Sequence, residues 1–123
     1  NRPGEIAKAS GILAGKNINI MSSASLGFSD RGATGFITGD ESGSRAALDE
    51  AGVTYAEYDI VQVRLLDQPG TLAQASQLLA DAGINIEFLA PTVIGSGGEV
   101  TLALGVGDRQ AAGQVLGELA VGD

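Results

Sequence analysis

The sequence predicts an α+β fold built from two copies of one βαββαβ unit, each with an antiparallel sheet and its helices on one sheet face. Three observations lead to this prediction. A run of residues near the start recurs without a gap 66 positions later. Both copies contain segments with the two-residue apolar period of strands and segments with the apolar spacing of helices. Glycine, proline and asparagine mark the turns between those segments.

The repeat defines the domain organisation. Residues 1–25 read NRPGEIAKASGILAGKNINIMSSAS, and residues 67–91 read DQPGTLAQASQLLADAGINIEFLAP. The identical pairs include Pro3/Pro69, Gly4/Gly70, Leu13/Leu79, Asn19/Asn85 and Ile20/Ile86. Chance does not produce identity over such a length, so we expect two modules, residues 1–59 and residues 60–123. No flexible linker is expected between them.

The second module is expected to open with a strand at Ile60–Leu66, in which apolar and polar residues alternate. The turn Asp67-Gln68-Pro69-Gly70 then leads into a helix that ends at Gly83. We expect Asp67 to cap this helix and Pro69 to lie near its first turn. The apolar residues at helical spacing are Leu72, Ala75, Leu79 and Ala82.

Two further strands and a second helix complete this module. The second strand is expected to begin over Ile84, Ile86 and Phe88, and the third to run through Val100–Val106. Between them, Gly95-Ser96-Gly97-Gly98 suits a hairpin turn better than a phosphate-binding loop, which would connect a strand to a helix. Asp108 is expected to cap a helix that reaches about Leu119, with the fourth strand short or absent.

The first module follows the same order from its turn onward. We expect helices at Gly4–Gly15 and Ser44–Ala51 and strands at Ile18–Leu26, Ala33–Thr38 and Val53–Tyr58, with Asn17 in the position that Gly83 holds later. The first strand of such a unit is central in its sheet, and none precedes Asn1. We therefore expect that residues before Asn1 are missing or that another segment fills the gap.

Charge and composition exclude several functions. The net charge is −8, and no two of the seven basic residues are adjacent, so nucleic acid and anionic membranes are disfavoured as partners. The sequence contains no leader and no apolar run near the roughly 20 residues that span a bilayer, so a soluble, cytoplasmic protein is expected. Cysteine and histidine are both absent, so we expect no metal site and no cofactor.

The same absences argue against catalysis. Ser10 and Ser76 occupy equivalent helix positions, but no histidine, cysteine or paired lysine is present to activate a serine nucleophile. Packing of small side chains between helix and sheet explains both residues better. Glu87 and Glu99 are expected to face each other across the hairpin, and two carboxylates alone make a weak case for glycosidase or metal chemistry. The sequence therefore predicts a protein that is not an enzyme.

The turn-and-helix motif resembles the ACT family of amino-acid-sensing domains. The family pattern is Asn/Asp-x-Pro-Gly after a strand, a helix of about 12 residues, and then Gly/Asn-Ile-Asn-Ile. Here it is matched by Asn1-Arg2-Pro3-Gly4 with Asn17-Ile18-Asn19-Ile20, and by Asp67-Gln68-Pro69-Gly70 with Gly83-Ile84-Asn85-Ile86. The likeness covers nearly the whole chain and is greatest to stand-alone proteins of two ACT repeats, with the ferredoxin-like fold.

The resemblance implies where an amino acid would bind, usually at an interface between modules. The implied ligand-binding residues are Asn1, Arg2, Gly4, Asn19 and Ile20 in the first copy and Asp67, Gln68, Gly70, Asn85 and Ile86 in the second. Side-chain oxygens would accept from the ligand ammonium, and helix-start N–H groups would donate to its carboxylate. The alternative is that the Asn1 and Asp67 side chains cap helices and that Asn19 and Asn85 satisfy turn backbone.

Two residues just before the second motif also bear on ligand binding, one as a departure from the family pattern and one as an additional candidate. Leu65 is apolar at a position where family members often carry a polar residue. Arg64, on the polar side of its strand, is a candidate to bind a ligand carboxylate, although a solvated or surface-paired side chain is the commoner role.

The resemblance implies a regulatory protein that binds an amino acid and acts through ligand-dependent packing of ACT modules. The alternative is a ligand-free assembly module, such as the regulatory small subunit of an amino-acid biosynthetic enzyme. We also expect a homodimer or higher assembly, since the sheet faces that carry no helices need cover.

Overall fold

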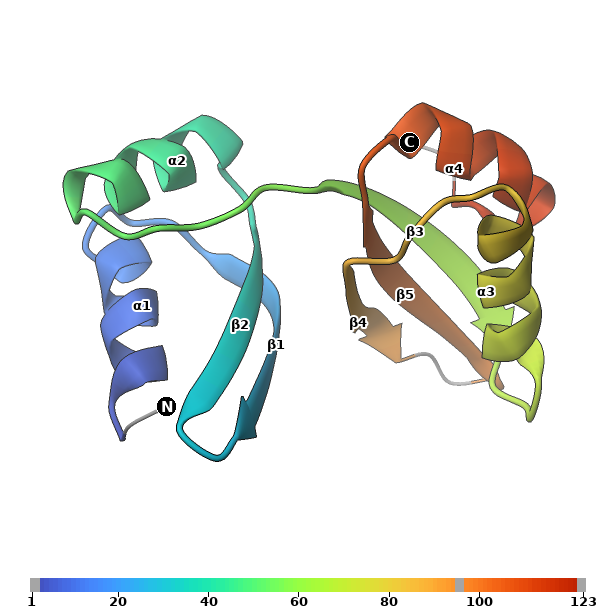
Figure 1. Cartoon of the computed structure of the whole chain (residues 1–123), viewed down its shortest axis with the longest axis horizontal. Coiled ribbons are helices and arrows are strands. Elements are labelled where there is room, and N and C mark those ends of the chain that lie inside the picture. The colour runs from blue at the N-terminus through green and yellow to red at the C-terminus, as the bar shows by residue number, and fades with distance from the viewer. Residues whose placement is uncertain (1–2, 95–96, 122–123) are drawn as a thin grey trace. The chain divides into compact units, whose positions relative to one another are not determined.

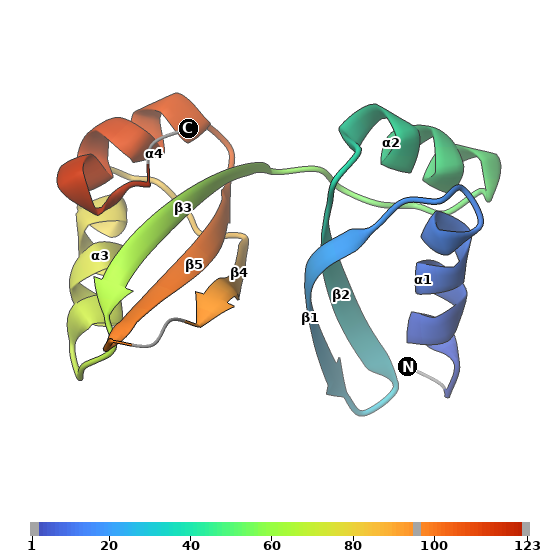
Figure 2. The ribbon, with the colours of Figure 1, turned by 180° about the vertical axis from the view of Figure 1, so that it is seen from behind.

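The computed structural model describes residues 3–94 and 97–121. The chain divides into two compact units, residues 1–56 and residues 57–123. Each described unit has an antiparallel sheet with two α-helices beside it (Figure 1; Figure 2, from behind). The α+β class with two antiparallel sheets is therefore as the sequence predicts, and it is consistent with ferredoxin-like βαββαβ modules.

Unit 1 has the element order α1 (Glu5–Ala14), β1 (Ile20–Phe28), β2 (Arg31–Thr38) and α2 (Glu41–Glu50). The two strands form an antiparallel hairpin in which Phe28 pairs with Arg31 and Ile20 with Thr38. Its buried residues are Leu13, Ile18 and Ala47, with partly buried Ile12, Ile20, Phe36 and Leu48 packed against them. This core is small, because the described part of unit 1 has one hairpin beneath its two helices.

Unit 2 begins with β3 (Asp59–Leu66), α3 (Thr71–Asp81) and β4 (Phe88–Ile94). It continues with β5 (Glu99–Val106), α4 (Arg109–Leu116) and a short 3₁₀ helix at Gly117–Leu119. The strand order is β3-β5-β4, with β5 antiparallel to both neighbours. On the other edge of β3, Ala120 bridges to Val63 and the Val121 N–H donates to the Gln62 carbonyl at 2.8 Å. The expected fourth strand is thus reduced to a bridge in the described residues.

The core of unit 2 lies between its sheet and both of its helices. The alternation predicted for β3 is present, since Val61, Val63 and Leu65 are 6%, 0% and 4% exposed. Their ladder partners on β5 are Leu104, Leu102 and Val100 in the same order. The helices contribute Ala75 and Leu79 from α3 and Ala112 and Leu116 from α4. Both helices therefore cover one face of the sheet, as expected for this topology.

The two units build the first helix in the same way. Gly4 and Gly70 precede α1 and α3 with φ of 93° and 91°, in the left-handed region. At the other end, Asn17 and Gly83 have φ of 58° and 73°, the conformation that ends many helices. The next residue folds back in each case, because the Ile18 N–H donates to Leu13 and the Ile84 N–H to Leu79, at 3.0 and 2.9 Å. The prediction that Asn17 takes the position of Gly83 is confirmed.

The second helix of each unit is capped by an aspartate. The Asp40 carboxylate accepts from the Gly43 N–H at 2.9 Å, so α2 begins at Glu41, earlier than the expected Ser44. The Asp108 carboxylate accepts from the Ala111 N–H at 3.0 Å, which confirms the cap predicted for α4. Helix and 3₁₀ turn together reach Leu119, as expected.

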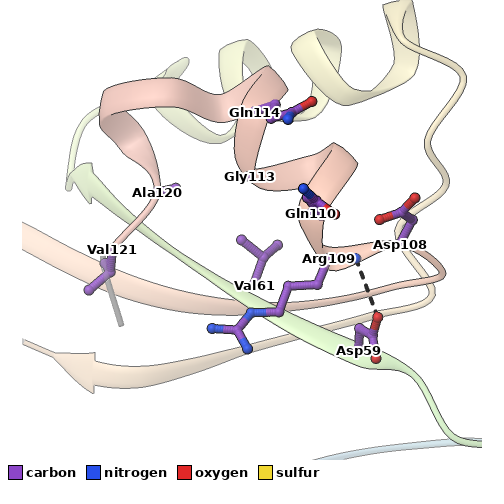
Figure 3. A pocket seen from close by; sticks show the side chains of 9 residues that line it. All are labelled: Asp59, Val61, Asp108, Arg109, Gln110, Gly113, Gln114, Ala120 and Val121. Carbon is purple, nitrogen blue, oxygen red and sulfur yellow. Dashed lines mark hydrogen bonds between the residues drawn. The ribbon is translucent and has the colours of Figure 1, made fainter.

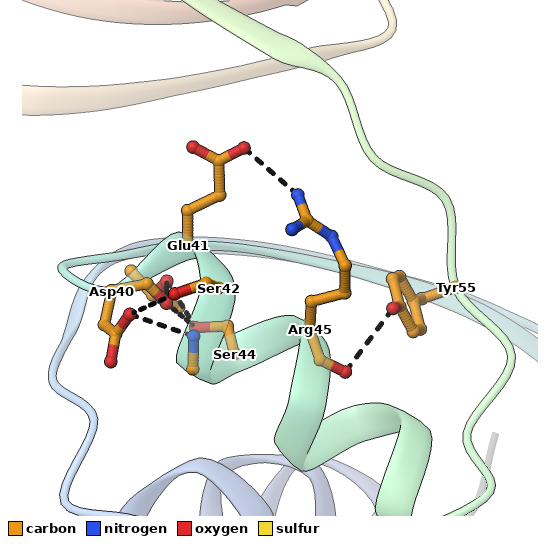
Figure 4. Close-up of polar contacts among 8 residues, drawn as sticks. Asp40, Glu41, Ser42, Ser44, Arg45 and Tyr55 are labelled. Carbon is orange, nitrogen blue, oxygen red and sulfur yellow. Dashed lines mark hydrogen bonds and ion pairs between the residues drawn. The ribbon is translucent and has the colours of Figure 1, made fainter.

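The prediction of a strand at Val53–Tyr58 is wrong. These residues carry no strand, and the Tyr55 hydroxyl instead donates to the Asp49 carboxylate and the Arg45 carbonyl on α2, at 2.8 and 3.5 Å (the Arg45 contact is drawn in Figure 4). In a βαββαβ unit this segment pairs with the first strand, and the described part of unit 1 has no strand before α1. Alternation alone cannot form a strand that lacks a partner.

Two details of the second hairpin also differ from the prediction, and a third lies outside the described residues. The strand begins at Phe88 and not at Ile84, although the Glu87 N–H just before it already donates to the Gly105 carbonyl on β5 at 2.8 Å. Glu87 lies beside Gly105, whereas Glu99 pairs with Leu66 at the other end of β5. The prediction that the two carboxylates face each other is therefore wrong. Residues 95–96 of the expected turn lie outside the described residues, although the strands on either side pair antiparallel.

Gly83→Ala is expected to lower the free energy of unfolding of unit 2 by about 1–2 kcal/mol, because alanine disfavours the left-handed conformation. A Cβ at Gly83 would meet no atom within 4 Å, so the cost is conformational and not steric. Denaturant-dependent amide hydrogen exchange in unit 2 measures the change. Gly113→Ala is the control, since this helical position is equally open and alanine there should stabilise by about 0.5–1 kcal/mol. Equal effects of the two substitutions would contradict the account.

Candidate functional site

The turn between β3 and α3 leads into a helix start that has no side-chain cap. Gly70 is the N-cap of α3, and no side chain accepts a hydrogen bond from the first turn. A Cβ at Gly70 would meet nothing within 4 Å, so this side of the turn is open. The positive end of the helix dipole lies at the same place. The arrangement suits a small anionic group, such as a carboxylate, which the helix start can bind through its N–H groups.

Thr71 fixes the shape of this turn. Its hydroxyl donates to the Leu66 carbonyl at 2.7 Å and to the Gln68 carbonyl at 3.1 Å. The Gln68 N–H donates to Leu66 at 2.9 Å, and Gln68 itself is exposed. The turn is therefore held from within, and the Gln68 side chain is directed to solvent. Thr71 was not among the residues predicted to shape this turn, although a threonine hydroxyl next to a turn commonly bonds to nearby backbone groups.

The expectation that Asp67 caps α3 is wrong. The N-cap is Gly70, and no cap bond is made by any side chain. The Asp67 N–H donates to the Gly98 carbonyl at 2.7 Å, which ties the turn to the start of β5, while the exposed carboxylate remains outside the helix. The left-handed Gly70 separates Asp67 from the first turn, so the carboxylate is displaced from the N–H groups that it would cap. A helix-capping role no longer competes with a ligand-binding role for this residue.

Asn85 lies in the extended segment between α3 and β4, beside an acid. Its amide nitrogen donates to the Glu87 carboxylate at 2.7 Å, and both residues are exposed. The atom that Asn85 offers to a ligand is therefore its amide oxygen, with a carboxylate next to it. Both groups suit an ammonium donor. The neighbouring Ile86 is partly buried against the core of unit 2, so only its backbone is available to a ligand.

The structure does not bring Asp67 and Asn85 together. Asp67 is bonded to Gly98, just before β5, whereas Glu87 is bonded to Gly105 near the end of the same strand. The two motif positions of unit 2 consequently lie at opposite ends of the sheet and of the 11-residue helix α3. At about 1.5 Å per residue, that helix alone keeps them roughly 16 Å apart. One small ligand cannot contact both positions within this unit.

The first copy presents a reduced version of the same features. Asn1 and Arg2 lie outside the described residues. Gly4 has the same open, left-handed geometry as Gly70, and α1 has no side-chain cap. Asn19 is exposed and its carbonyl accepts from the Gly39 N–H at 3.2 Å, while Ile20 packs against the core. Position 21 is a methionine and not an acid, so the partner that Glu87 provides for Asn85 has no counterpart beside Asn19.

The other residues singled out by the sequence are not part of these turns. Leu65 is buried in the core of unit 2, and Arg64 is exposed on the opposite side of the same strand. The Ser10 and Ser76 hydroxyls donate to the carbonyls of Ile6 and Leu72 one turn earlier, at 2.8 and 2.7 Å. The two serines are engaged by their own helices, in agreement with a structural role.

A shallow hollow lies elsewhere in unit 2, between β3 and α4 (Figure 3). Its polar lining includes Asp59, Asp108 and Arg109, and the Arg109 backbone N–H donates to Asp59 at 3.3 Å. None of the ten residues expected to bind a ligand lines this hollow. Asp108 already occupies the helix start there, so the hollow does not offer the uncapped N–H groups found at Gly70.

No group of three or more acidic, histidine or cysteine side chains within residues 3–94 and 97–121 is arranged to hold a metal ion. No helix in these ranges is long and apolar enough to cross a membrane.

Comparison with known proteins identifies part of the chain. Residues 60–120 match the family model of the ACT domain, so the chain contains an ACT domain over these residues. A search of curated proteins found no match. The ACT match spans β3 to Ala120, which is nearly all of the described part of unit 2.

Solved structures resemble the whole chain in fold. Protein BT0572 from Bacteroides thetaiotaomicron aligns with 96% of this chain and 81% of its own, at 22% identity and a TM-score of 0.72. The ligand-free regulatory subunit of aspartate kinase from Thermus thermophilus aligns with 94% of this chain and 83% of its own, at 21% identity and a TM-score of 0.64. A structure of aspartokinase alpha and beta subunits aligns at 22% identity with a TM-score of 0.59, covering 94% of this chain and 82% of that one. At these identities the likeness shows the fold alone.

Asp67→Ala is expected to change the stability of unit 2 by less than about 0.5 kcal/mol, because an exposed side chain without a cap bond is lost. Asp108→Ala is the matched comparison and should cost about 0.5–2 kcal/mol, since its carboxylate does cap a helix. Urea unfolding of both variants, with hydrogen exchange to resolve unit 2, gives the two values. Equal losses of stability in the two variants would mean that Asp67 does cap α3.

Proposed function

We propose that this protein is a regulatory amino-acid sensor, made of two ACT modules and acting through ligand-dependent packing of such modules. An ACT domain at residues 60–120, together with a fold like that of an aspartate kinase regulatory subunit, supports a regulatory, amino-acid-sensing role. The finer steps of the proposal are that residues 1–59 form a second ACT module, that a free amino acid binds, and that no reaction is catalysed.

The repeated helix ends support the two-module part of the proposal. The left-handed glycines before α1 and α3 lie 66 positions apart, as do the residues that end these helices. The fold-back bonds from Ile18 and Ile84 recur at the same spacing. Independent segments would have no reason to share these rare conformations at one fixed offset.

The open helix start at Gly70 is the observation that carries the ligand part. It lies inside the ACT match and leaves backbone N–H groups without a side-chain cap, as a ligand carboxylate requires. Asn85 with Glu87 offers acceptors for an ammonium. Because these two places lie at opposite ends of α3, an amino acid that uses both kinds of position must take them from two modules. Ligand binding would then favour one packing of modules over another.

The charges of unit 2 favour some amino acids over others. Asp67 lies at one ligand-binding end of the unit and Glu87 at the other, and no basic residue adjoins either in sequence. Like charges repel in a partly enclosed site, so aspartate and glutamate should bind less well there than neutral or cationic amino acids.

A ligand-free assembly module is the second candidate function. Large apolar side chains on the strands of unit 1 support it, since Met21, Leu26 and Phe28 are 65%, 65% and 52% exposed. Such a module would associate with itself or with a biosynthetic enzyme through these residues and would need no small molecule.

Isothermal titration of the whole chain with each free amino acid separates the two functions. The sensor should give a saturable signal with one or a few neutral or cationic amino acids, and a rise in melting temperature with the same ones. Sedimentation with and without the binding amino acid then shows whether the assembly changes. If no amino acid gives a titration signal or raises the melting temperature, the sensor function is contradicted and the assembly module is favoured.

Asn85→Ala is expected to weaken amino-acid binding about tenfold or more, because a hydrogen bond to a charged group contributes about 1.5–3 kcal/mol. The melting temperature of the free protein should hardly change, since the side chain is exposed. Gln77→Ala is a matched control, because its amide donates to Asp81 at the same 2.7 Å on the surface of α3 and neither residue is among those expected to bind a ligand. Loss of stability without loss of affinity in the Asn85 variant would mean that its role is structural.

A further inference from the structure

One face of the β1–β2 hairpin is not covered by a helix in the described part of unit 1. Both helices lie on the same side of the hairpin (Figure 1; Figure 2, from behind), and Phe36 packs against the core on that side. Paired residues of an antiparallel ladder share a face, and successive residues alternate between faces. The register therefore defines the opposite, outer face by four pairs, Ser22/Ile37, Ala24/Gly35, Leu26/Ala33 and Phe28/Arg31.

The outer face is bulky at one end and shallow at the other. Near the hairpin turn, Leu26 and Phe28 project from β1 and are 65% and 52% exposed. Toward the open end of the hairpin, Ala24 pairs with Gly35, and neither residue has a side chain larger than a methyl group. A surface with a bulky half and a shallow half along the same strands is complementary to a second copy of itself turned end over end, so that the turn of one hairpin lies over the open end of the other.

The charge of the outer face also suits a second copy. The chain has a net charge of −8, so two copies repel each other over most of their surfaces. None of the eight residues of the outer face is acidic, and Arg31 alone among them is charged. Two hairpins can therefore approach through this face without bringing carboxylates together, provided that the two Arg31 guanidinium groups are kept apart.

We propose that two copies of the chain associate through this outer face, with the hairpins packed face to face and end over end about a two-fold axis. Leu26 and Phe28 of each copy would cover the shallow half of the other, at Ala24 and Ser22. The two Arg31 side chains would lie at opposite ends of the contact, whereas packing turn on turn would bring them together and leave the shallow halves without contact. Each copy gives and receives the same side chains, as a two-fold interface requires.

The corresponding sheet face of unit 2 has the wrong chemistry to cover this surface. It carries Gln62 and Arg64, which are both exposed, and the Thr92 hydroxyl donates to the Gln62 side chain at 2.9 Å. Burial of the Arg64 guanidinium and of this polar pair against an apolar surface would cost free energy, and no carboxylate of the outer face would offset it. A second hairpin offers mostly apolar and small residues instead, so the observations favour a second copy of unit 1.

The size of the contact determines its strength. Strands rise about 3.4 Å per residue and lie about 4.8 Å apart, so a two-stranded face of this length covers roughly 300 Å² per copy. Stable interfaces bury about 800 Å² per partner, so the dissociation constant of this dimer should be about 10 μM or higher. The association goes beyond the proposed function, because it requires no amino acid and is compatible with both the sensor and the assembly module.

Sedimentation equilibrium of the whole chain without ligand, from about 10 to about 500 μM, tests the proposal. Leu26→Ser and Phe28→Ser should each weaken the dimer about tenfold or more, since a few bulky side chains dominate the affinity of a contact. Leu66→Ser is the matched control, because Leu66 is also 52% exposed at a strand position but belongs to unit 2. It should leave the association unchanged, and the melting temperature of each variant shows whether the fold is retained.

Ala24→Leu separates a fitted contact from non-specific apolar association. The substitution makes the outer face more apolar, but it fills the shallow half where Leu26 of the other copy would lie. The fitted dimer should therefore weaken about tenfold or more, because overfilling a packed contact is destabilising. Non-specific association through apolar side chains would become stronger instead.

Weakening of the dimer by all three outer-face substitutions, with the Leu66 variant unchanged, supports the proposal. A chain that remains monomeric over the whole concentration range overturns it, as does a dimer that the three substitutions leave unchanged. The proposal is also overturned if Ala24→Leu strengthens the association or if Leu66→Ser weakens it equally. These results are independent of the proposed function, which is decided by titration with amino acids.

Discussion

Unit 2 depends on the contact between the aliphatic row of β3 and the helices that cover it. Val63 and Leu79 are completely buried in that contact. The remaining strands are positioned by β5, which pairs with β3 on one side and with β4 on the other. Burial of one such side chain contributes roughly 1.5–3 kcal/mol, which is a large fraction of the net stability of a domain this small. The corresponding strand is missing from the described part of unit 1, whose core is limited to Leu13, Ile18, Ala47 and their neighbours. The difference between the units follows from this one strand.

A second constraint, the left-handed glycine before each first helix, connects fold to function. At Gly70 the chain turns sharply enough that no preceding side chain reaches the first turn of α3. An aspartate cap, such as those of α2 and α4, would satisfy the same N–H groups internally. The contrast between capped second helices and uncapped first helices gives the ACT domain one helix start that remains available to a ligand. That availability has a stability cost, since a cap bond contributes about 1 kcal/mol.

Most of the fold could be predicted because its signals are local. The repeat, the alternation in β3 and the helix stops at Asn17 and Gly83 depend on short stretches of sequence. The strand expected at Val53–Tyr58 failed because a strand needs a partner, and that partner is not coded in the segment itself. The prediction that Glu87 faces Glu99 failed for a related reason. The cross-strand neighbour of Glu87 depends on where β4 begins and therefore on the register of the hairpin. Asp67 failed as a cap because residue preference does not decide which of four turn residues adopts the N-cap conformation.

The candidate site is defined less by the sequence than by backbone geometry. The motif identified the turn at Gly70 and the segment at Asn85, but not their separation by the length of α3. Heteronuclear NMR titration of the labelled protein with an amino acid that binds in calorimetry tests the central claim most directly. We expect saturable shifts of the Leu72 and Ala73 backbone amides and of the Asn85 side-chain amide. Shifts confined to the hollow between β3 and α4, with those amides unchanged, would contradict it.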